Sequence, residues 1–281
     1  MARETGREGR DSVSKRRDLE QHLAQLHDLR KILDSMKALA YMETRRLAEF
    51  LDAQQRTVRT IDKVARDFLA FFPELLRDEP QPRRACLLIG SERGFCGDFN
   101  DALLRALPRS DDIILVAIGQ KLHAAVSELA NPQRLLAGPD TSDEVDAILT
   151  LIIGTLTELQ LQYGPFAIDI LHNDDKGDIQ TRTLLPPDSL RGTPDQRHAY
   201  PPHLQLPPEQ VMTALVDRYV FATLNAVLFT SLMAENTRRV QHLSSAVHHL
   251  DEKGVELKRR SNELRQEEIT EEIEVILLSA G

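Results

Sequence analysis

The feature that most constrains the fold is a heptad repeat over the last part of the chain, Pro207–Gly281. Mostly apolar side chains recur there every seven residues along two lines, which is typical of a coiled coil. One line comprises Leu215, Ala222, Phe229, Asn236, Leu243, Leu250, Leu257 and Leu264, and the other comprises Met212, Tyr219, Ala226, Met233, Val240 and Val247. At 1.5 Å per residue, one helix over this stretch would extend on the order of 100 Å. The repeat therefore predicts a long helix over 207–281 that needs a partner.

A second heptad repeat predicts that partner over residues 14–76. Its main line is Leu19, Leu26, Leu33, Ala40, Leu47, Gln54, Ile61 and Phe68, and a companion line is expected at His22, Leu29, Met36, Glu43, Phe50, Thr57, Val64 and Phe71. Prolines at 73, 80 and 82 limit how far this helix can continue. Residues 1–13 mix basic with acidic side chains and are expected to form a disordered tail. Two long helices at the chain ends are most simply antiparallel, and a seven-residue repeat gives a left-handed coiled coil.

Residues 84–200 have a different pattern, with short apolar runs separated by helical stretches. This rhythm is typical of an α/β sheet covered by helices, here a Rossmann-like module. The expected strands are Ala85–Gly90, Ile113–Ile118, Phe166–His172 and Ile179–Leu185, and the expected helices are Phe99–Leu107, Lys121–Ala130 and Ser142–Tyr163 with Ser142 as its cap. A proline-rich link over 186–208 leads to the last helix.

Composition restricts the function classes. A net charge of −9 argues against a nucleic-acid-binding protein. No apolar run approaches the roughly eighteen residues that span a bilayer, so the chain is expected to be soluble, or peripheral to a membrane through partners. The two cysteines, Cys86 and Cys96, lack other cysteines with which to form a ligand set and are expected to be reduced.

We identify no catalytic, cofactor-binding or metal-binding constellation. The glycines at 90, 94 and 97 follow the first expected strand, but their spacing is not G-x-G-x-x-G, and no G-x-x-x-x-G-K-[ST] occurs. His248 and His249 are adjacent, so on a helix they point about 100° apart and cannot share a metal. The acidic residues between Glu267 and Glu274 are spread around their helix, as on a solvated face.

Three motifs resemble those of the γ subunits of F-type ATP synthases. Leu29–Ala40 (LRKILDSMKALA) is similar to the family's T-x-K-I-T-x-A-M-x-M-V-A. Ser91–Asn100 (SERGFCGDFN) is similar to S-D-R-G-L-C-G-x-x-N. Asn262–Ile273 (NELRQEEITEEI) is similar to N-x-x-R-Q-x-x-I-T-x-E-[IL] and is the most specific of the three. The first motif is only partly kept, which indicates a divergent bacterial member, such as one of an alternative ion-translocating F-type ATPase.

The resemblance implies a non-catalytic rotor shaft without cofactors, which couples proton or sodium flow to ATP synthesis or hydrolysis. Its partners would be the α and β subunits of the catalytic hexamer, the ε subunit and the membrane c-ring, with no nucleic acid. The expected location is the cytoplasmic face of the bacterial inner membrane, peripheral through the complex. Contacts with the catalytic ring are expected from Lys31, Met36, Arg265, Gln266, Thr270 and Glu272, and the apolar end Ile273–Leu278 would turn in an apolar sleeve.

Two other interpretations remain open at this point. The first is a Rossmann-like enzyme with helical dimerisation arms, which a nucleotide-binding titration would reveal. The second is a cytoplasmic coiled-coil scaffold, which would not purify with ATPase subunits.

Overall fold

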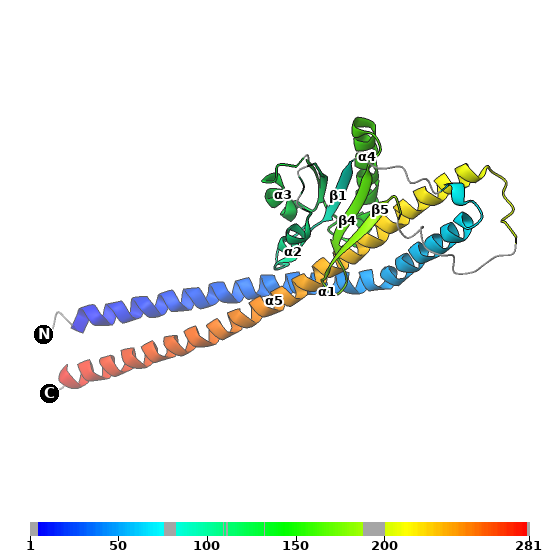
Figure 1. Cartoon of the computed structure of the whole chain (residues 1–281). Coiled ribbons are helices and arrows are strands. Elements are labelled where there is room, and N and C mark those ends of the chain that lie inside the picture. The colour runs from blue at the N-terminus through cyan, green and yellow to red at the C-terminus, as the bar shows by residue number, and fades with distance from the viewer. Residues whose placement is uncertain are drawn as a thin grey trace. The chain divides into compact units, whose positions relative to one another are not determined.

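The structure, a computed structural model, describes residues 5–75, 83–108, 110, 112–131, 133–187 and 200–279. The chain forms two compact units, one made of Met1–Leu39 with Val240–Gly281 and the other of Ala40–Arg239. Two long helices, α1 (Thr5–Leu69) and α5 (Pro208–Ser279), contribute residues to both units (Figure 1). Together with the α/β module in the second unit, these helices confirm the predicted fold class.

The first unit is an antiparallel pair of helical segments. Arg16 pairs with Glu268 at 3.0 Å and Arg30 pairs with Asp251 at 2.6 Å, so rising numbers in α1 meet falling numbers in α5. Leu243 and Val247 are buried here, as their positions in the heptad repeat predict. The unit is therefore held by an apolar line with ion pairs beside it, as in a coiled coil.

The second unit is built on a five-stranded sheet with the order β3-β2-β1-β4-β5. The strands are β1 (Arg84–Ile89), β2 (Ile114–Ile118), β3 (Gln133–Leu136), β4 (Ala167–Asn173) and β5 (Ile179–Leu185). The first four strands are parallel to one another, and β5 pairs antiparallel with β4. Both faces of β1, β2 and β4 are buried, which explains the nearly continuous apolar sequences of β1 and β2.

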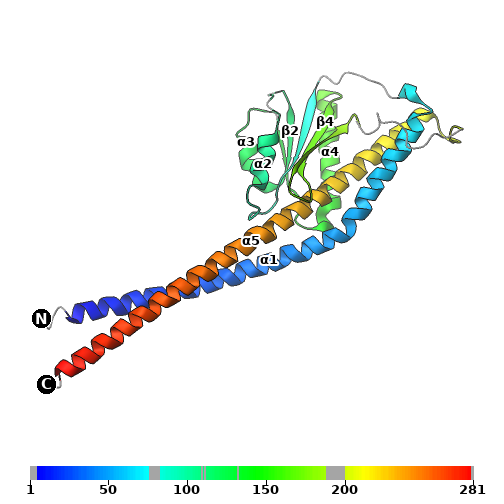
Figure 2. The same ribbon diagram turned by 60° about the horizontal axis from the view of Figure 1, so that its bottom comes forward.

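Helices cover both faces of this sheet (Figure 2). One face packs against α4 (Val145–Tyr163) and α5, and the other packs against α2 (Phe99–Ala106) and α3 (Gln120–Ser127). Alternate residues of β1 divide between the two cores, with Leu87 on the α4 side and Leu88 on the α2 side. This alternation follows from the two-residue period of a strand.

The middle of α5 is buried on all sides within the second unit, since every residue from 222 to 232 is buried. Leu228 and Leu232 pack in the sheet core, whereas Ala222 and Ala226 pack against Val58 of α1. Among the described residues, α5 is the one helix long and apolar enough to cross a membrane, and half of its most apolar window is buried in the protein. The expectation that no such stretch exists was therefore wrong. The charge-free middle of α5 packs against the sheet core and α1.

Several boundaries differ from the sequence-based expectations. The helix α1 begins at Thr5, where a tail over 1–13 was expected, and ends at Leu69 before a 3-10 turn at Pro73–Leu75. The strand β3 was not expected. Ser142 does not cap α4, because a 3-10 turn over Ser142–Glu144 precedes that helix. The Ser142 backbone N–H instead donates to Glu43 of α1 at 2.6 Å.

The expected companion line of α1 was also wrong by one residue. Leu29, Phe50 and Val64 lie about half exposed, at 50%, 44% and 48%. The positions one residue later are the ones that face inward in the second unit, namely Leu51, Val58 and Ala65. Positions three and four residues from the main line both lie near it on a helix, and the two candidate lines contain equal numbers of apolar residues, so spacing and composition did not separate them.

Candidate functional site

An exposed apolar stripe runs along α1 in the first unit. Leu29, Ile32 and Leu39 are exposed and Met36 is half-buried. At 100° per residue these four side chains lie within about 80° of one another on the helix. Exposed apolar stripes of this kind mark surfaces that contact other molecules. Sequence reasoning had named Met36 as a contact but had placed both Met36 and Leu29 on the companion line of the seam, because heptad spacing alone cannot separate the two faces.

The other predicted residue of α1, Lys31, lies outside this stripe. Its ammonium group is 3.6 Å from the Asp28 carboxylate, and the side chain is largely exposed. An exposed pair of this kind contributes little to stability. Lys31 therefore remains available to an external partner.

The four predicted residues of α5, Arg265, Gln266, Thr270 and Glu272, are all exposed. The structure brings Gln266 and Thr270 together, and the Thr270 hydroxyl donates to the Gln266 carbonyl at 2.9 Å. Both border a surface hollow of about 440 Å³ whose other lining residues are Glu263, Glu267, Glu271 and Glu274. Arg265 and Glu272 lie on the opposite side of the helix by the 100° rule, and among the described residues neither forms an ion pair. The four predicted residues therefore form two separate pairs, Gln266 with Thr270 and Arg265 with Glu272.

A second exposed apolar stripe lies at the end of the same helix. Ile269, Ile273, Ile276 and Leu277 are exposed by roughly half or more and recur at helical spacing. Three of these residues belong to Ile273–Leu278, the segment that was expected to turn in an apolar sleeve. The first unit thus presents an exposed apolar stripe on each helix, one over Leu29–Leu39 of α1 and one at the end of α5, and the polar pairs lie beside the second.

In the second unit, α5 is tied to the loop after β1 by a buried ion pair. Glu235 and Arg239 are 4% and 5% exposed and form an ion pair one helical turn apart. The Glu235 carboxylate accepts the backbone N–H groups of Glu92 and Arg93, each at 3.2 Å. The Arg239 guanidinium donates to the Gly94 carbonyl at 3.2 Å. Burial raises the pKa of the Glu235 carboxyl, which Arg239 and the two backbone donors oppose.

Arg238 extends this connection on the same turn of α5. Its guanidinium donates to Asp98 and to the carbonyl of Gly177 in the β4–β5 turn, both at 3.0 Å. Three side chains within about one turn of α5 therefore join the helix to two loops of the module. Sequence reasoning noted Glu235 and Arg239 as similar to family residues, but it had no signal for their backbone partners.

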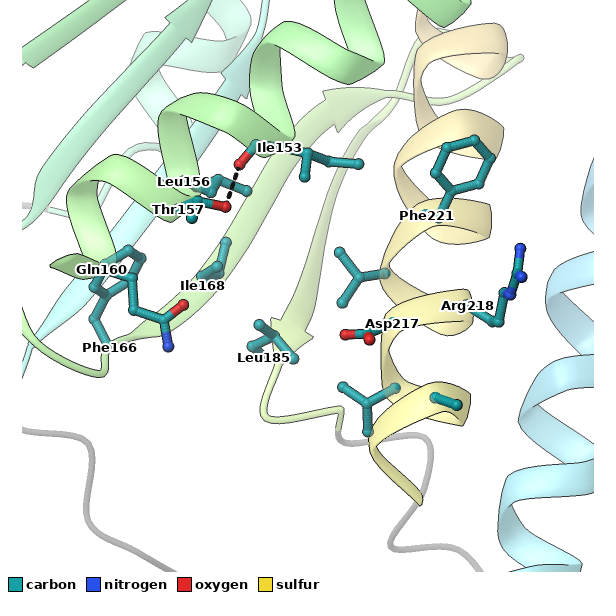
Figure 3. A pocket seen from close by; sticks show the side chains of 13 residues that line it. Ile153, Leu156, Thr157, Gln160, Phe166, Ile168, Leu185, Asp217, Arg218 and Phe221 are labelled. Carbon is teal, nitrogen blue, oxygen red and sulfur yellow. Dashed lines mark hydrogen bonds between the residues drawn. The ribbon is translucent and has the colours of Figure 1, made fainter. Parts of the chain in front are cut away.

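A hollow in the second unit lies between α4 and α5 (Figure 3). It has a volume of about 550 Å³ and is mostly apolar, with Ile153, Ile168, Leu185 and Phe221 among its lining residues. In Figure 3 the Asp217 side chain points into the hollow, whereas Arg218 points away from it towards α1. No acid, base and nucleophile are arranged together here as a catalytic group would require.

The described residues provide neither a metal-binding cluster nor a reactive thiol. Among the residues that the structure describes, no three His, Cys, Asp or Glu side chains form a group that could hold a metal. Burial raises the pKa of Cys86 to about 12 and that of Cys96 to about 11, so neither thiol is a nucleophile near neutral pH.

Comparison with known proteins identifies relatives along almost the whole chain. The family model described as ATP synthase matches residues 15–280. The ATP synthase gamma chain of Clostridium perfringens is 23% identical over 278 residues, which cover 92% of this chain and 95% of the relative. The gamma chain of Methylococcus capsulatus is 25% identical over 283 residues, with 92% and 96% covered.

Solved structures show the same fold. A chain from the OSCP/F1/c-ring structure of the Euglena gracilis mitochondrial ATP synthase superposes with a TM-score of 0.65 at 14% identity, covering 95% of this chain and 94% of that one. A chain from the central stalk and c-ring of the Tetrahymena thermophila mitochondrial ATP synthase gives a TM-score of 0.54 at 15% identity, with 76% and 99% covered.

Proposed function

The chain belongs to the ATP synthase gamma-chain family, and from that premise we propose that it transmits torque between an ion-driven membrane rotor and a catalytic ring. A gamma chain is a non-catalytic subunit that forms the central stalk of the complex. The observation that carries the proposal is the family match over residues 15–280, which includes both long helices and the module. The Rossmann-like enzyme with dimerisation arms finds no support among the relatives.

The proposed partners are the α and β subunits of the catalytic hexamer, the ε subunit and the membrane c-ring. The complex is attached to a membrane sector, and we place the chain at the cytoplasmic face of a bacterial inner membrane. Its bacterial relatives support this assignment. The driving ion is a proton or sodium.

The first unit is the proposed contact with the catalytic ring. A turning surface needs few strong directional contacts, because deep complementarity to one position would hold it there. Exposed apolar stripes on α1 and α5 suit sliding contact, since apolar packing is non-directional. Met36 would lie in the sliding surface. Lys31, Arg265, Gln266, Thr270 and Glu272 would supply the directional contacts.

The test is a double substitution, Arg265→Ala with Gln266→Ala, in the assembled complex. A charged hydrogen bond contributes about 1.5–3 kcal/mol, and about 1.4 kcal/mol corresponds to a tenfold change in rate. We therefore expect ATP hydrolysis and ATP-driven ion transport to fall by one to two orders of magnitude. Circular dichroism of the purified chain should show unchanged helicity, because both side chains are exposed.

A matched control replaces two exposed basic residues earlier on the same helix, Lys258→Ala with Arg259→Ala. This control should leave turnover and transport close to those of the parent. Normal turnover in the Arg265/Gln266 variant would show that these residues are not the directional contacts.

A further inference from the structure

Three parallel strands of the module end at one edge of the sheet. In doubly wound folds, ligand phosphates bind outside the carboxyl ends of such strands, beside the start of a helix. Here β1, β2 and β3 end at Ile89, Ile118 and Leu136. The loops that follow them contain the acidic residue Glu92, the first residue of α3 and a glycine, Gly138.

A side chain of the protein itself occupies this edge. One oxygen of the Glu92 carboxylate, Oε2, accepts the backbone N–H of Gln120 at 3.0 Å and the backbone N–H of Gly138 at 2.7 Å. We call these two N–H groups the oxyanion cradle. One comes from the first residue of α3, which follows β2, and the other from the loop after β3, while the carboxylate comes from the loop after β1. One negatively charged oxygen therefore joins all three connections.

The backbone around the cradle leaves little room for a side chain at two glycine positions. Gly119 has φ of +110°, and a Cβ there would lie 2.7 Å from the carbonyl oxygens of Gly90 and Ser91. A Cβ on Gly138 would lie 3.2 Å from the Cα of Gly119 and 3.3 Å from the Oε2 atom of Glu92. Two loops thus approach each other closely around the carboxylate oxygen.

Backbone hydrogen bonds also hold Glu92 in place beside the cradle. Its own backbone N–H donates to the Oε2 atom of Glu235, the buried carboxylate of α5. Ser91, the residue before it, is held by the Asn100 side chain, whose Oδ1 accepts the Ser91 N–H at 3.0 Å. The backbone is therefore fixed at the residue that fills the cradle and at the residue before it.

We propose that the Glu92 carboxylate is a built-in oxyanion in the phosphate position of the module, and that a free inorganic oxyanion binds there when this carboxylate is removed. The carboxylate competes with any external anion because it is tethered and already bonded to both donors. The module thus keeps the donors of a phosphate site while Glu92 closes it. This assignment is independent of the rotor function.

The experiment uses the full-length chain with Glu92→Ala. Both cradle donors then lose their acceptor. In phosphate-free buffer we expect Tm to fall by roughly 2–4 °C, a shift that corresponds to about one net hydrogen bond in a domain of this size. Adding inorganic phosphate at constant ionic strength should recover most of that fall. Isothermal titration should show phosphate binding to the variant and not to the parent.

Glu144→Ala is the matched control. The Glu144 carboxylate also accepts a backbone N–H, that of Asp140 at 2.8 Å, but it lies outside the cradle. This control should lose stability without any recovery in phosphate. If Glu92→Ala does not fold, Glu92→Ser gives the same expectation, because serine is polar but too short to reach either donor. A variant whose Tm responds to phosphate no more than that of the parent or the Glu144 control would overturn the proposal.

Discussion

The thiols of Cys86 and Cys96 show how burial controls the chemistry of a single residue. Both side chains lie in the core between the sheet and the α2 and α3 helices. Because the thiolate is the reactive form, a thiol pKa of about 11 to 12 makes reaction slow. We expect the native chain to react with iodoacetamide at least about 100-fold more slowly than the chain unfolded in denaturant. Mass spectrometry measures both alkylation rates, and equal rates would contradict the burial of these thiols.

His172 gives the module a predictable acid sensitivity. The imidazole is buried at the end of β4, and burial lowers its pKa below the ordinary value of 6.5, while nearby Asp174 raises it and Arg182 lowers it further. The folded state then binds fewer protons than the unfolded state below pH 6.5. The contribution of His172 to stability is therefore present above pH 6.5 and is lost as the pH falls towards the lowered pKa.

His172→Gln removes this titration. We expect the free energy of unfolding of the parent to fall more steeply than that of the variant as the pH drops from about 7 to 5. Denaturant titrations at several pH values measure both slopes. Parallel profiles would mean that His172 is protonated as easily in the folded state as in the unfolded one.

The partners of single polar residues could be predicted only in part from the sequence. Glu235 and Arg239 are spaced one turn apart on a helix, so their ion pair is a local feature that the sequence contains. Their bonds to the backbone around Gly94 join residues that lie far apart in the chain. The same holds for Ser142, whose hydroxyl suggested a cap while its backbone contacts Glu43. Such partners are set by tertiary packing.

At the scale of elements, buried strands and long helices were predictable and the sheet edge was not. β1 and β2 are almost continuous apolar runs, because both of their faces are covered, and β4 keeps an apolar run interrupted by Asp169. β3 is a short edge strand of sequence QRLL with two exposed residues. Edge strands keep polar residues and little periodicity, so β3 had no signal strong enough to separate it from a loop.

Two valines of α1 test which face of this helix is buried in the second unit. Val58 is 5% exposed and packs with Ala222 and Ala226, whereas Val64 is 48% exposed. Val58→Ala should lower the free energy of unfolding by about 1–3 kcal/mol, since two buried methyl groups are lost. Val64→Ala should change it by about 0.5 kcal/mol or less. Denaturant unfolding compares the two variants. Equal losses of the free energy of unfolding would mean that Val64 is buried as the companion line first predicted.

At the scale of the whole molecule, the short motifs were more informative than the overall similarity. The gamma chains compared here are only 23% and 25% identical to this chain. Two of the three recognisable motifs, those at 29–40 and 262–273, belong to the first unit apart from Ala40. The contact roles within these motifs could not be derived from the sequence, because they depend on surfaces of other subunits.

Met36→Lys tests the sliding surface in the assembled complex. Met36 is half-buried beside the exposed Ile32 and Leu39. A lysine here adds a charge that can form a strong polar contact with an acidic partner group. We expect normal assembly but fewer ions transported per ATP hydrolysed, measured in inverted vesicles.

Met36→Leu is the matched control, since it conserves volume and polarity. It should transport as many ions per ATP as the parent. If the lysine variant transports as many ions per ATP as the parent, Met36 does not belong to the proposed contact surface.

The pairing of the first residues of the chain with the last has a consequence for biosynthesis. Met1–Leu39 forms a unit with Val240–Gly281, so its partner emerges from the ribosome only after the whole second unit has been synthesised. The second unit, Ala40–Arg239, is a continuous segment and can fold earlier. A long wait without a partner favours an N-terminal segment with alternating charges, such as DSVSKRRDLEQ over 11–21, which stays dispersed in water. The end of this protein that makes the proposed contacts is thus the last part that a nascent chain can complete.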